Sequence, residues 1–244
     1  MKRFYKDVSV KEEGGAWRIL LDGRMLKTQA RNTVELPNKP LAEAVAQEWR
    51  QQGEEIDPPN MFLTRLTFAA IDGARAERER VAGHAFSYGK TDLLAYRAEH
   101  PDELVVRQTR TWDPLLEWAA KHHGAKLNVA SGITFTEQPP ESLAALERAI
   151  AANDEFTLAA LHTAATITGS LVLALALVAR QITAKEAFAA ATLDEAFQSE
   201  KWGTDAEAEA RLKRLSAELS ATERFLQLIS LSPAGGEGRG EGAS

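Results

Sequence analysis

One segment of the chain resembles a nucleotide-binding loop: the stretch from Gly83 to Thr91, which ends in Gly-Lys-Thr. A phosphate-binding loop needs four residues between its glycines, so that successive backbone amides converge on the phosphates, and it follows a strand. Here five residues separate Gly83 from Gly89, and the preceding RAERERVA has a helical pattern. We therefore expect a helix with one core-facing stripe, and no ATP binding or hydrolysis.

The other residue types that support catalysis or metal binding are not arranged for either. The sequence has five histidines and no cysteine, and no two histidines have the i, i+4 spacing that directs both imidazoles to one metal. His122 and His123 precede Gly124 at the end of a predicted helix, where cations favour the helix dipole and glycine caps the last turn. Ser170 lies in an apolar segment without a Gly-x-Ser-x-Gly motif. We expect no catalytic residues, no metal and no cofactor.

An acidic segment, TLDEAFQSEKWGTD at 192–205, lacks a simple structural explanation. Asp194, Glu195 and Glu200 precede a Trp-Gly turn, and acids near the C-terminus of a helix oppose its dipole. Residues that cost local stability are candidates for function. An ion pair with an arginine elsewhere would explain the acids equally well, so both interpretations stay open.

Composition narrows the classes of function. The net charge is −6, and lysine and arginine are interspersed with acids, so the basic surface that nucleic acid requires is missing. Without cysteine there is no disulfide framework, and the first residues, MKRFYKDVSV, lack the features of a signal or transit peptide. These features favour a cytoplasmic location.

The stretch from Phe156 to Ala179 carries no fixed charge and is long enough to span a bilayer. His162, Gly169 and several threonines within it oppose insertion. We expect a buried core helix, with a membrane-associated helix as the alternative.

The predicted fold class is α+β, with a small antiparallel β-rich N-terminal domain and a larger all-α helical domain. Strands are expected at 4–10, 16–21, 25–28 and 33–36, because Gly-Gly and Asp-Gly turns separate them, and a helix over 41–52 covers them. This first domain comprises residues 1–60, and helices fill residues 61–232, with Asn60 as the first cap. Thr183 with Glu186 and Thr204 with Glu207 predict capping boxes. The segment 127–136 is either a strand or an ordered connection, and the Gly-rich tail 233–244 is expected to be disordered.

The order of several motifs resembles that of the ATP synthase F1-sector assembly chaperones, a mitochondrial and α-proteobacterial family that holds the free alpha subunit. The matching stretches are RFYKDVSV at 3–10, LDGRMLKT at 21–28, Glu48-Trp49 with Gln52, MFLTRL at 61–66, Ala70-Ile71-Asp72, TDLLAYRA at 91–98, Trp112-Asp113-Pro114-Leu115 with Trp118, Ser170-Leu171, and LDEAFQSEKWGTDAEAEAR at 193–211. The resemblance implies a chaperone without catalytic activity that shields the alpha subunit until the beta subunit replaces it. It also implies a cytoplasmic protein in bacteria, a matrix protein in mitochondria, and we expect a monomer.

A chaperone of this kind needs apolar or aromatic anchors ringed by polar groups. The residues predicted to bind the client are Glu195, Asp194, Gln198, Glu200, Trp202 and Trp49. Trp49 shares a helical stripe with Leu41 and Val45, so a place in the core is its alternative. The alternative for Glu195 is an internal ion pair. The competing function is a hydrolase or transferase whose carboxylates, led by Glu195, converge only in three dimensions, and it requires an enclosed acidic pocket.

Overall fold

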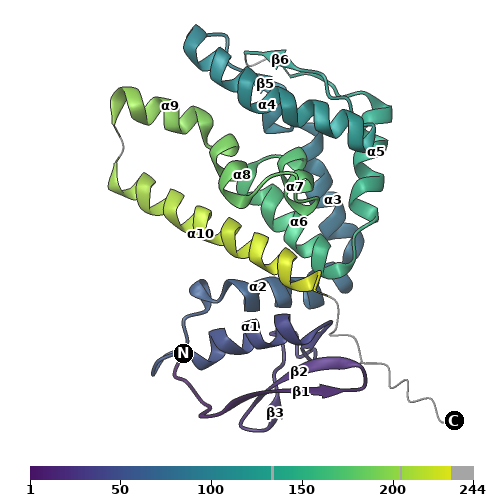
Figure 1. Ribbon diagram of the computed structural model, residues 1–244, viewed down its shortest axis with the longest axis vertical. Coiled ribbons are helices and arrows are strands. Elements are labelled where there is room, and N and C mark those ends of the chain that lie inside the picture. Colours follow the sequence, from purple (N-terminus) through teal and green to yellow (C-terminus); the bar gives the residue numbers. More distant parts are fainter. Residues whose placement is uncertain (133–134, 204, 232–244) are drawn as a thin grey trace, which may run out of the picture.

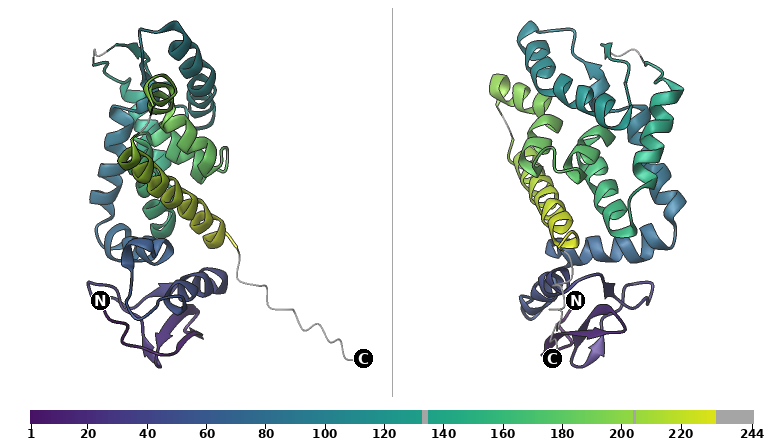
Figure 2. Two further views of the ribbon diagram at one scale, coloured as in Figure 1. Left: turned by 90° about the vertical axis from the view of Figure 1, so that its left-hand side faces the viewer. Right: turned by 45° about the vertical axis from the view of Figure 1, so that its right-hand side comes forward.

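The computed structural model describes residues 1–132, 135–203 and 205–231. An antiparallel sheet and its covering helix form one end of the molecule, and helices build the remainder (Figure 1). Both views of Figure 2 keep this separation, with the N-terminal strands at the bottom and the helices above them. The predicted α+β class is confirmed.

Glycine turns set the register of the N-terminal sheet. Its strands are β1 (Val8–Glu13), β2 (Ala16–Leu21), β3 (Arg24–Met25) and β4 (Glu35–Leu36). β2 is central and pairs antiparallel with each of the others. Gly14 and Gly15 close the first hairpin, and Asp22 and Gly23 the second, all four with positive φ, as short hairpin turns require. The first strand begins later than Phe4, where it was expected.

Helix α1 (Lys39–Arg50) covers the sheet because one of its faces is apolar. Leu41 and Val45 are fully buried, and Trp49 is 7 % exposed, so the stripe seen in the sequence is the face that packs. Asn38 caps the helix by accepting a hydrogen bond from the backbone N–H of Leu41 at 2.9 Å.

The first α-helix of the helical part, α2 (Phe62–Phe68), is capped by Glu48, a residue of α1. The elements of the helical part are η1 (Pro58–Asn60), α2 (Phe62–Phe68), η2 (Ala69–Arg75), α3 (Arg78–Lys90), η3 (Leu93–Ala95), α4 (Asp102–His123), α5 (Pro140–Ala151), α6 (Glu155–Thr168), α7 (Leu171–Val178), α8 (Ala184–Ala191), α9 (Leu193–Trp202) and α10 (Ala206–Ile229). The short helices η1 and η3 are 3-10 helices, and η2 is a π-helix that continues α2. The carboxylate of Glu48 on α1 accepts hydrogen bonds from the backbone N–H groups of Leu63 and Thr64, each at 2.8 Å. The Asn60 side chain binds Asp57 instead, so the prediction that Asn60 caps this helix was wrong.

The uncharged stretch 156–179 forms two helices, α6 and α7, where one was expected. Gly169 ends α6 with a left-handed φ of 68°, and the Ser170 hydroxyl caps α7 by accepting from the N–H of Leu173. The residues of α7 from 171 to 177 are at most 3 % exposed, which confirms their place in the core. Among the described residues, none of the helices combines the length and hydropathy of a bilayer span.

A short parallel ladder answers the open question about residues 127–136. β6 (Ala130–Ser131) lies within this segment and pairs in parallel with β5 (Tyr96–Arg97). In the described part of this segment, 127–132 and 135–136, the backbone is irregular apart from this one short strand. Residues 133 and 134 lie outside the described part of the chain.

Helix α10 links the two ends of the molecule. Near its C-terminus Phe225 is fully buried, and the Asn38 amide nitrogen donates to the carbonyl oxygens of Leu228 and Ile229 at 2.9 and 3.3 Å. Asn38 is 1 % exposed, so one buried amide caps α1 and also holds the end of α10. The N-terminal end of α10 lies near α9, and its C-terminal end lies near α1 and α2 (Figure 1).

The start of α10 is capped by Asp205, whose carboxylate accepts from the N–H of Ala208 at 2.8 Å. Thr204, the expected cap, lies outside the described residues, as does the tail 233–244.

Candidate binding surface on helix α9

The acidic segment does not continue the helix that begins after Thr183. The predicted capping box of Thr183 and Glu186 is present at the start of α8, but that helix stops at Thr192, where φ is −104° and ψ is 16°. A new helix, α9, then places Asp194 and Glu195 in its first turn, where carboxylates favour the dipole. The expectation that these two acids oppose a helix dipole was wrong.

Phe197 holds α9 against α4. It is 3 % exposed, and two cations cover its ring, Arg107 at 5.1 Å and Lys201 at 5.2 Å from the ring centroid. Each cation–π contact of this kind stabilises a partly exposed site by about 0.5–1 kcal/mol. One face of α9 is therefore committed to the bundle.

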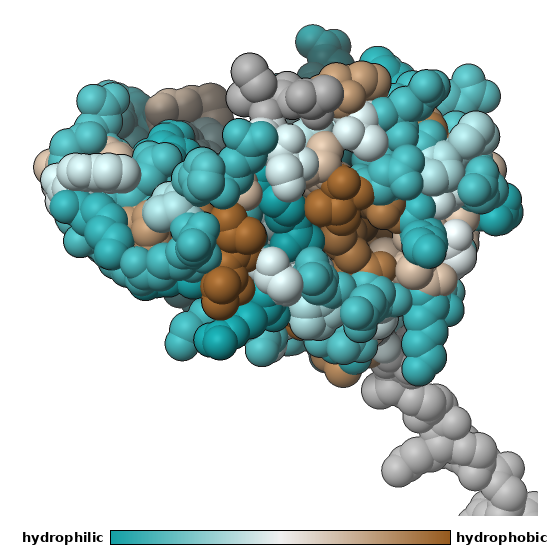
Figure 3. All heavy atoms as spheres, turned by 90° about the horizontal axis from the view of Figure 1, so that it is seen from above, coloured by the Kyte–Doolittle hydropathy of each residue, from teal (hydrophilic) through white to brown (hydrophobic). Residues whose placement is uncertain are grey.

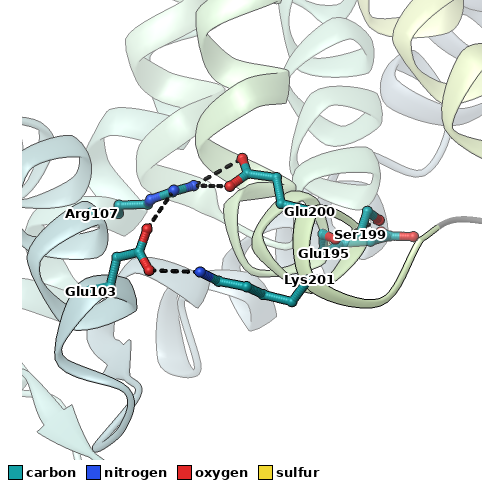
Figure 4. Close-up of polar contacts among 6 residues, drawn as sticks. All are labelled: Glu103, Arg107, Glu195, Ser199, Glu200 and Lys201. Carbon is teal, nitrogen blue, oxygen red and sulfur yellow. Dashed lines mark hydrogen bonds and ion pairs between the residues drawn. The ribbon is translucent and has the colours of Figure 1, made fainter.

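The same two cations belong to a network of ion pairs (Figure 4). Arg107 of α4 donates to both carboxylate oxygens of Glu200, at 2.9 and 2.8 Å, and to Glu103 at 2.8 Å. Lys201 donates to Glu103 at 2.9 Å, and hydrogen bonds from Lys201 and Arg107 lower the pKa of the Glu103 carboxyl. Glu200, predicted to bind the client, thus pairs with α4, but the Arg107 and Glu200 side chains are 38 % and 52 % exposed, so this pair also lies at the surface.

Asp194 is also engaged inside the protein. It accepts a hydrogen bond at 2.8 Å from the amide nitrogen of Gln108, which is 1 % exposed. The other end of that amide accepts from the backbone N–H of Ala98 at 2.9 Å. A buried amide needs partners at both ends, so Asp194 completes a polar bridge between α4 and α9.

Glu195 pairs with Arg211 of α10 at 2.6 Å. The two side chains are 34 % and 48 % exposed, so the pair lies at the surface. Of the two interpretations left open for Glu195, neither holds alone, because this acid is both paired and accessible. A surface pair can exchange partners at little cost, since its net contribution is only about 0–1 kcal/mol.

Three of the predicted residues share the outer face of α9. Glu195, Gln198 and Trp202 follow at steps of three and four, which places them on one side of a helix. Gln198 is exposed and Trp202 is 79 % exposed, and among the described residues neither side chain has a hydrogen-bond partner. A large exposed aromatic side chain beside polar groups is typical of protein-binding surfaces. We call Glu195, Gln198 and Trp202 the α9 face.

Trp49 lies far from this face. It is a core residue, packed on Tyr5 with ring centroids 5.6 Å apart, and its carbonyl oxygen accepts from the Tyr5 hydroxyl at 2.8 Å. Its buried ring also lines a hollow beside the sheet. The structure therefore does not bring Trp49 together with the five residues of α9.

The end of the molecule that carries α4 and α9 is mostly hydrophilic, as seen from above in Figure 3. Two separate hydrophobic patches interrupt it. Small apolar areas with a polar surround suit reversible binding, because extended apolar surfaces promote aggregation.

The arrangement does not support catalysis. Burial raises the pKa of the Glu48 and Asp92 carboxyls, that of Asp92 to about 6, but both groups are helix caps. Among the described residues, histidine, aspartate and glutamate form no cluster suited to a metal. The Gly83–Thr91 segment lies mainly in α3, as predicted, and therefore has no phosphate-binding loop. Glu195 is on an open surface, whereas the competing hydrolase required it in an enclosed pocket.

Sequence reasoning missed the partners that fix α9. Arg107, Gln108 and Arg211 are separated from their acids by 93, 86 and 16 positions. The i, i+4 spacing of Glu103 and Arg107 was visible as a helical pair, but it gave no sign of a contact with α9.

The fold is that of a two-part α+β protein, and the α9 face leaves a large aromatic side chain exposed. Comparisons with known proteins give its family. The family described as "ATP12 chaperone protein" matches residues 2–120. Crystallised Atp12 from Paracoccus denitrificans is 41 % identical, with 93 % of this chain and 98 % of that chain covered and a TM-score of 0.87. An aspartate-to-lysine variant of the same protein matches equally well, at 41 % identity, a TM-score of 0.87, and 93 % and 97 % coverage. Protein atp12, mitochondrial, of Schizosaccharomyces pombe is 26 % identical over 83 % of this chain and 74 % of its own.

The chain belongs to the ATP12 chaperone family. It is thus a chaperone for ATP synthase assembly and not an enzyme, as the resemblance implied.

Proposed function

We propose that this chaperone binds the unassembled alpha subunit of the F1 sector and shields the surface that the beta subunit later covers. The α9 face provides the contact, and the chaperone works as a monomer in the bacterial cytoplasm. Trp202 is the anchor, Glu195 supplies the charge and Gln198 supplies adaptable hydrogen bonds. Asp194 acts indirectly, because its hydrogen bond from the buried Gln108 holds α9 in position. Glu200 is a surface acid beside the α9 face, and its exposed pair with Arg107 can open as that of Glu195 can.

The exposure of Trp202 is the observation that carries this proposal. At 79 % it is the most exposed of the large hydrophobic side chains in the described part of the chain. Burial of this indole in an interface would remove its apolar surface from water, and a tryptophan at the centre of an interface commonly contributes about 2 kcal/mol or more. The neighbouring Glu195–Arg211 pair can open to receive a cation of the client.

Capture of the alpha subunit from cells that lack the beta subunit tests the proposal. We expect the wild-type protein to capture it, Trp202→Ala and Glu195→Lys to lose most of the capture, and added beta subunit to displace the chaperone. Glu147→Lys is the matched control, because Glu147 is an exposed acid on α5 with no ion pair among the described residues. Equal capture by all four proteins would refute the role of the α9 face, and no capture by the wild type would refute the choice of client.

A further inference from the structure

The N-terminal end of the molecule has a large hollow that the α9 face leaves unexplained. It measures about 740 Å³ and lies between the sheet and α2. Tyr5, Trp49, Ile56 and Phe68 contribute to its apolar wall. This volume is within the range of ligand-binding pockets, but the hollow contains no cluster of reactive groups.

All three methionines of the chain line this hollow: Met1, Met25 and Met61. Methionine is flexible and polarisable, and surfaces that accept varied apolar partners use it in excess. Met25 is 41 % exposed, and Phe4, which also lines the hollow, is 65 % exposed. The hollow is therefore adaptable, and its apolar lining reaches the surface.

The rim of the hollow is cationic although the whole chain carries a net charge of −6. Arg24 and Lys27 line it and have no ion pair among the described residues. Asp22 is the acid of the lining, and its carboxylate accepts from the backbone N–H groups of Lys6 and Asp7 at 3.0 and 2.8 Å. The free charges at the rim thus favour an acidic partner.

The hollow continues along the surface. A second depression of about 380 Å³ shares Gln29, Arg65 and Phe68 with it and extends to Thr163 on α6 and Glu218 on α10. Its two acids are already bound, because Glu218 pairs with Arg65 and Asp72 accepts hydrogen bonds from Thr28 and Asn32. A compact ligand would fill only one of the two, whereas an extended polypeptide fits both.

We propose that this hollow, with its continuation across α2, binds a segment of the client in which apolar side chains are flanked by acidic ones. This site is additional to the α9 face and lies at the opposite end of the molecule (Figure 1). It rests on the proposed function only in that its occupant is part of the same client.

The first test uses 8-anilinonaphthalene-1-sulfonate, an apolar anion with the chemistry of the expected occupant. We expect the folded protein to bind it, and Met25→Glu and Arg24→Glu to weaken binding at least tenfold. The matched controls Val129→Glu and Lys126→Glu change an exposed valine and an exposed lysine of the helical part and should leave binding unchanged. Near-ultraviolet circular dichroism verifies that each variant is folded. Unchanged dye binding by both test variants would overturn the proposal.

The second test asks what occupies the hollow. Overlapping peptides that cover the alpha subunit sequence, and separately oleate, are titrated against the dye-loaded protein. Displacement by peptides that combine apolar and acidic residues supports the proposal, and displacement by oleate alone overturns it in favour of a lipid site. In alpha-subunit capture, Met25→Glu should weaken binding while Val129→Glu does not. Capture that is sensitive to Met25→Glu but not to Trp202→Ala would refute the α9 face and leave this hollow supported.

Discussion

The pair of Glu195 and Arg211 allows stability to be separated from client binding. We consider three changes: Glu195→Arg, Arg211→Glu, and both together, which restores an ion pair with its charges exchanged. In the wild type the two side chains meet at 2.6 Å while 34 % and 48 % of their surfaces stay exposed. Solvent screens such a pair, so it stabilises the fold by about 0.2–1 kcal/mol.

Each single reversal replaces this attraction with repulsion between like charges. We expect each to lower the free energy of unfolding by about 1 kcal/mol, which for a chain of this length lowers the melting temperature by roughly 2–4 °C. The double exchange should regain most of that loss. Urea denaturation of the four proteins gives the coupling energy directly.

In the double exchange we expect alpha-subunit capture to fall even though the stability of the fold is largely restored. If the client meets Glu195 as proposed, the double exchange presents a cation at that place, so alpha-subunit capture should fall roughly thirtyfold, corresponding to a loss of about 2 kcal/mol. A coupling energy above about 3 kcal/mol would show that the pair is a buried structural bridge. Wild-type capture by the double exchange would show that the client ignores the sign of this charge. Either result would refute the reasoning.

Two further predictions concern the buried carboxylates. Asp92→Ala removes the acceptor of the Leu94 and Val172 N–H groups and should destabilise the protein by about 2–4 kcal/mol at pH 7. Because burial raises the Asp92 pKa from 3.8 to about 6, the folded protein binds this proton more tightly than the unfolded chain does. The stability of the wild type relative to this variant should therefore increase by about 3 kcal/mol as the pH falls from above 6 to below 4, and a pH-independent difference in urea titrations would contradict this. Glu48→Ala should lower stability by about 2 kcal/mol, because two N–H groups at the start of α2 lose their cap; an unchanged melting temperature would disprove this role.

Local rules recovered much of the fold. The Gly-Gly and Asp-Gly turns predicted the hairpins because few residues other than glycine tolerate positive φ, and the stripe of Leu41, Val45 and Trp49 predicted the face that α1 buries. The sequence pattern failed where a distant residue replaces a local signal. Glu48 on α1 accepts hydrogen bonds from the first N–H groups of α2. Asn60, the local candidate for this cap, binds Asp57 instead.

In the candidate site, too, local sequence predicted some features, and residues distant in the sequence determine the others. The acidic Trp-Gly segment drew attention because of its composition, and its exposed tryptophan and glutamine agree with a binding surface. Arg107, Gln108 and Arg211 decide which acids of α9 are paired inside the protein. These partners lie on α4 and α10, and no rule of sequence spacing predicts contacts between separate helices. The break at Thr192 was missed because Ala184, Phe188, Ala191 and Glu195 follow one another at helical steps across it.

The central claim is that the α9 face contacts the alpha subunit. A photo-crosslink from this face tests that contact most directly. A benzophenone amino acid at Gln198 reports the neighbours of the α9 face, and the same group at Glu147 on α5 serves as control. We predict an efficient, light-dependent crosslink from position 198 to the alpha subunit, and none from position 147. A complex that forms normally but crosslinks from neither position, or equally from both, would contradict the account.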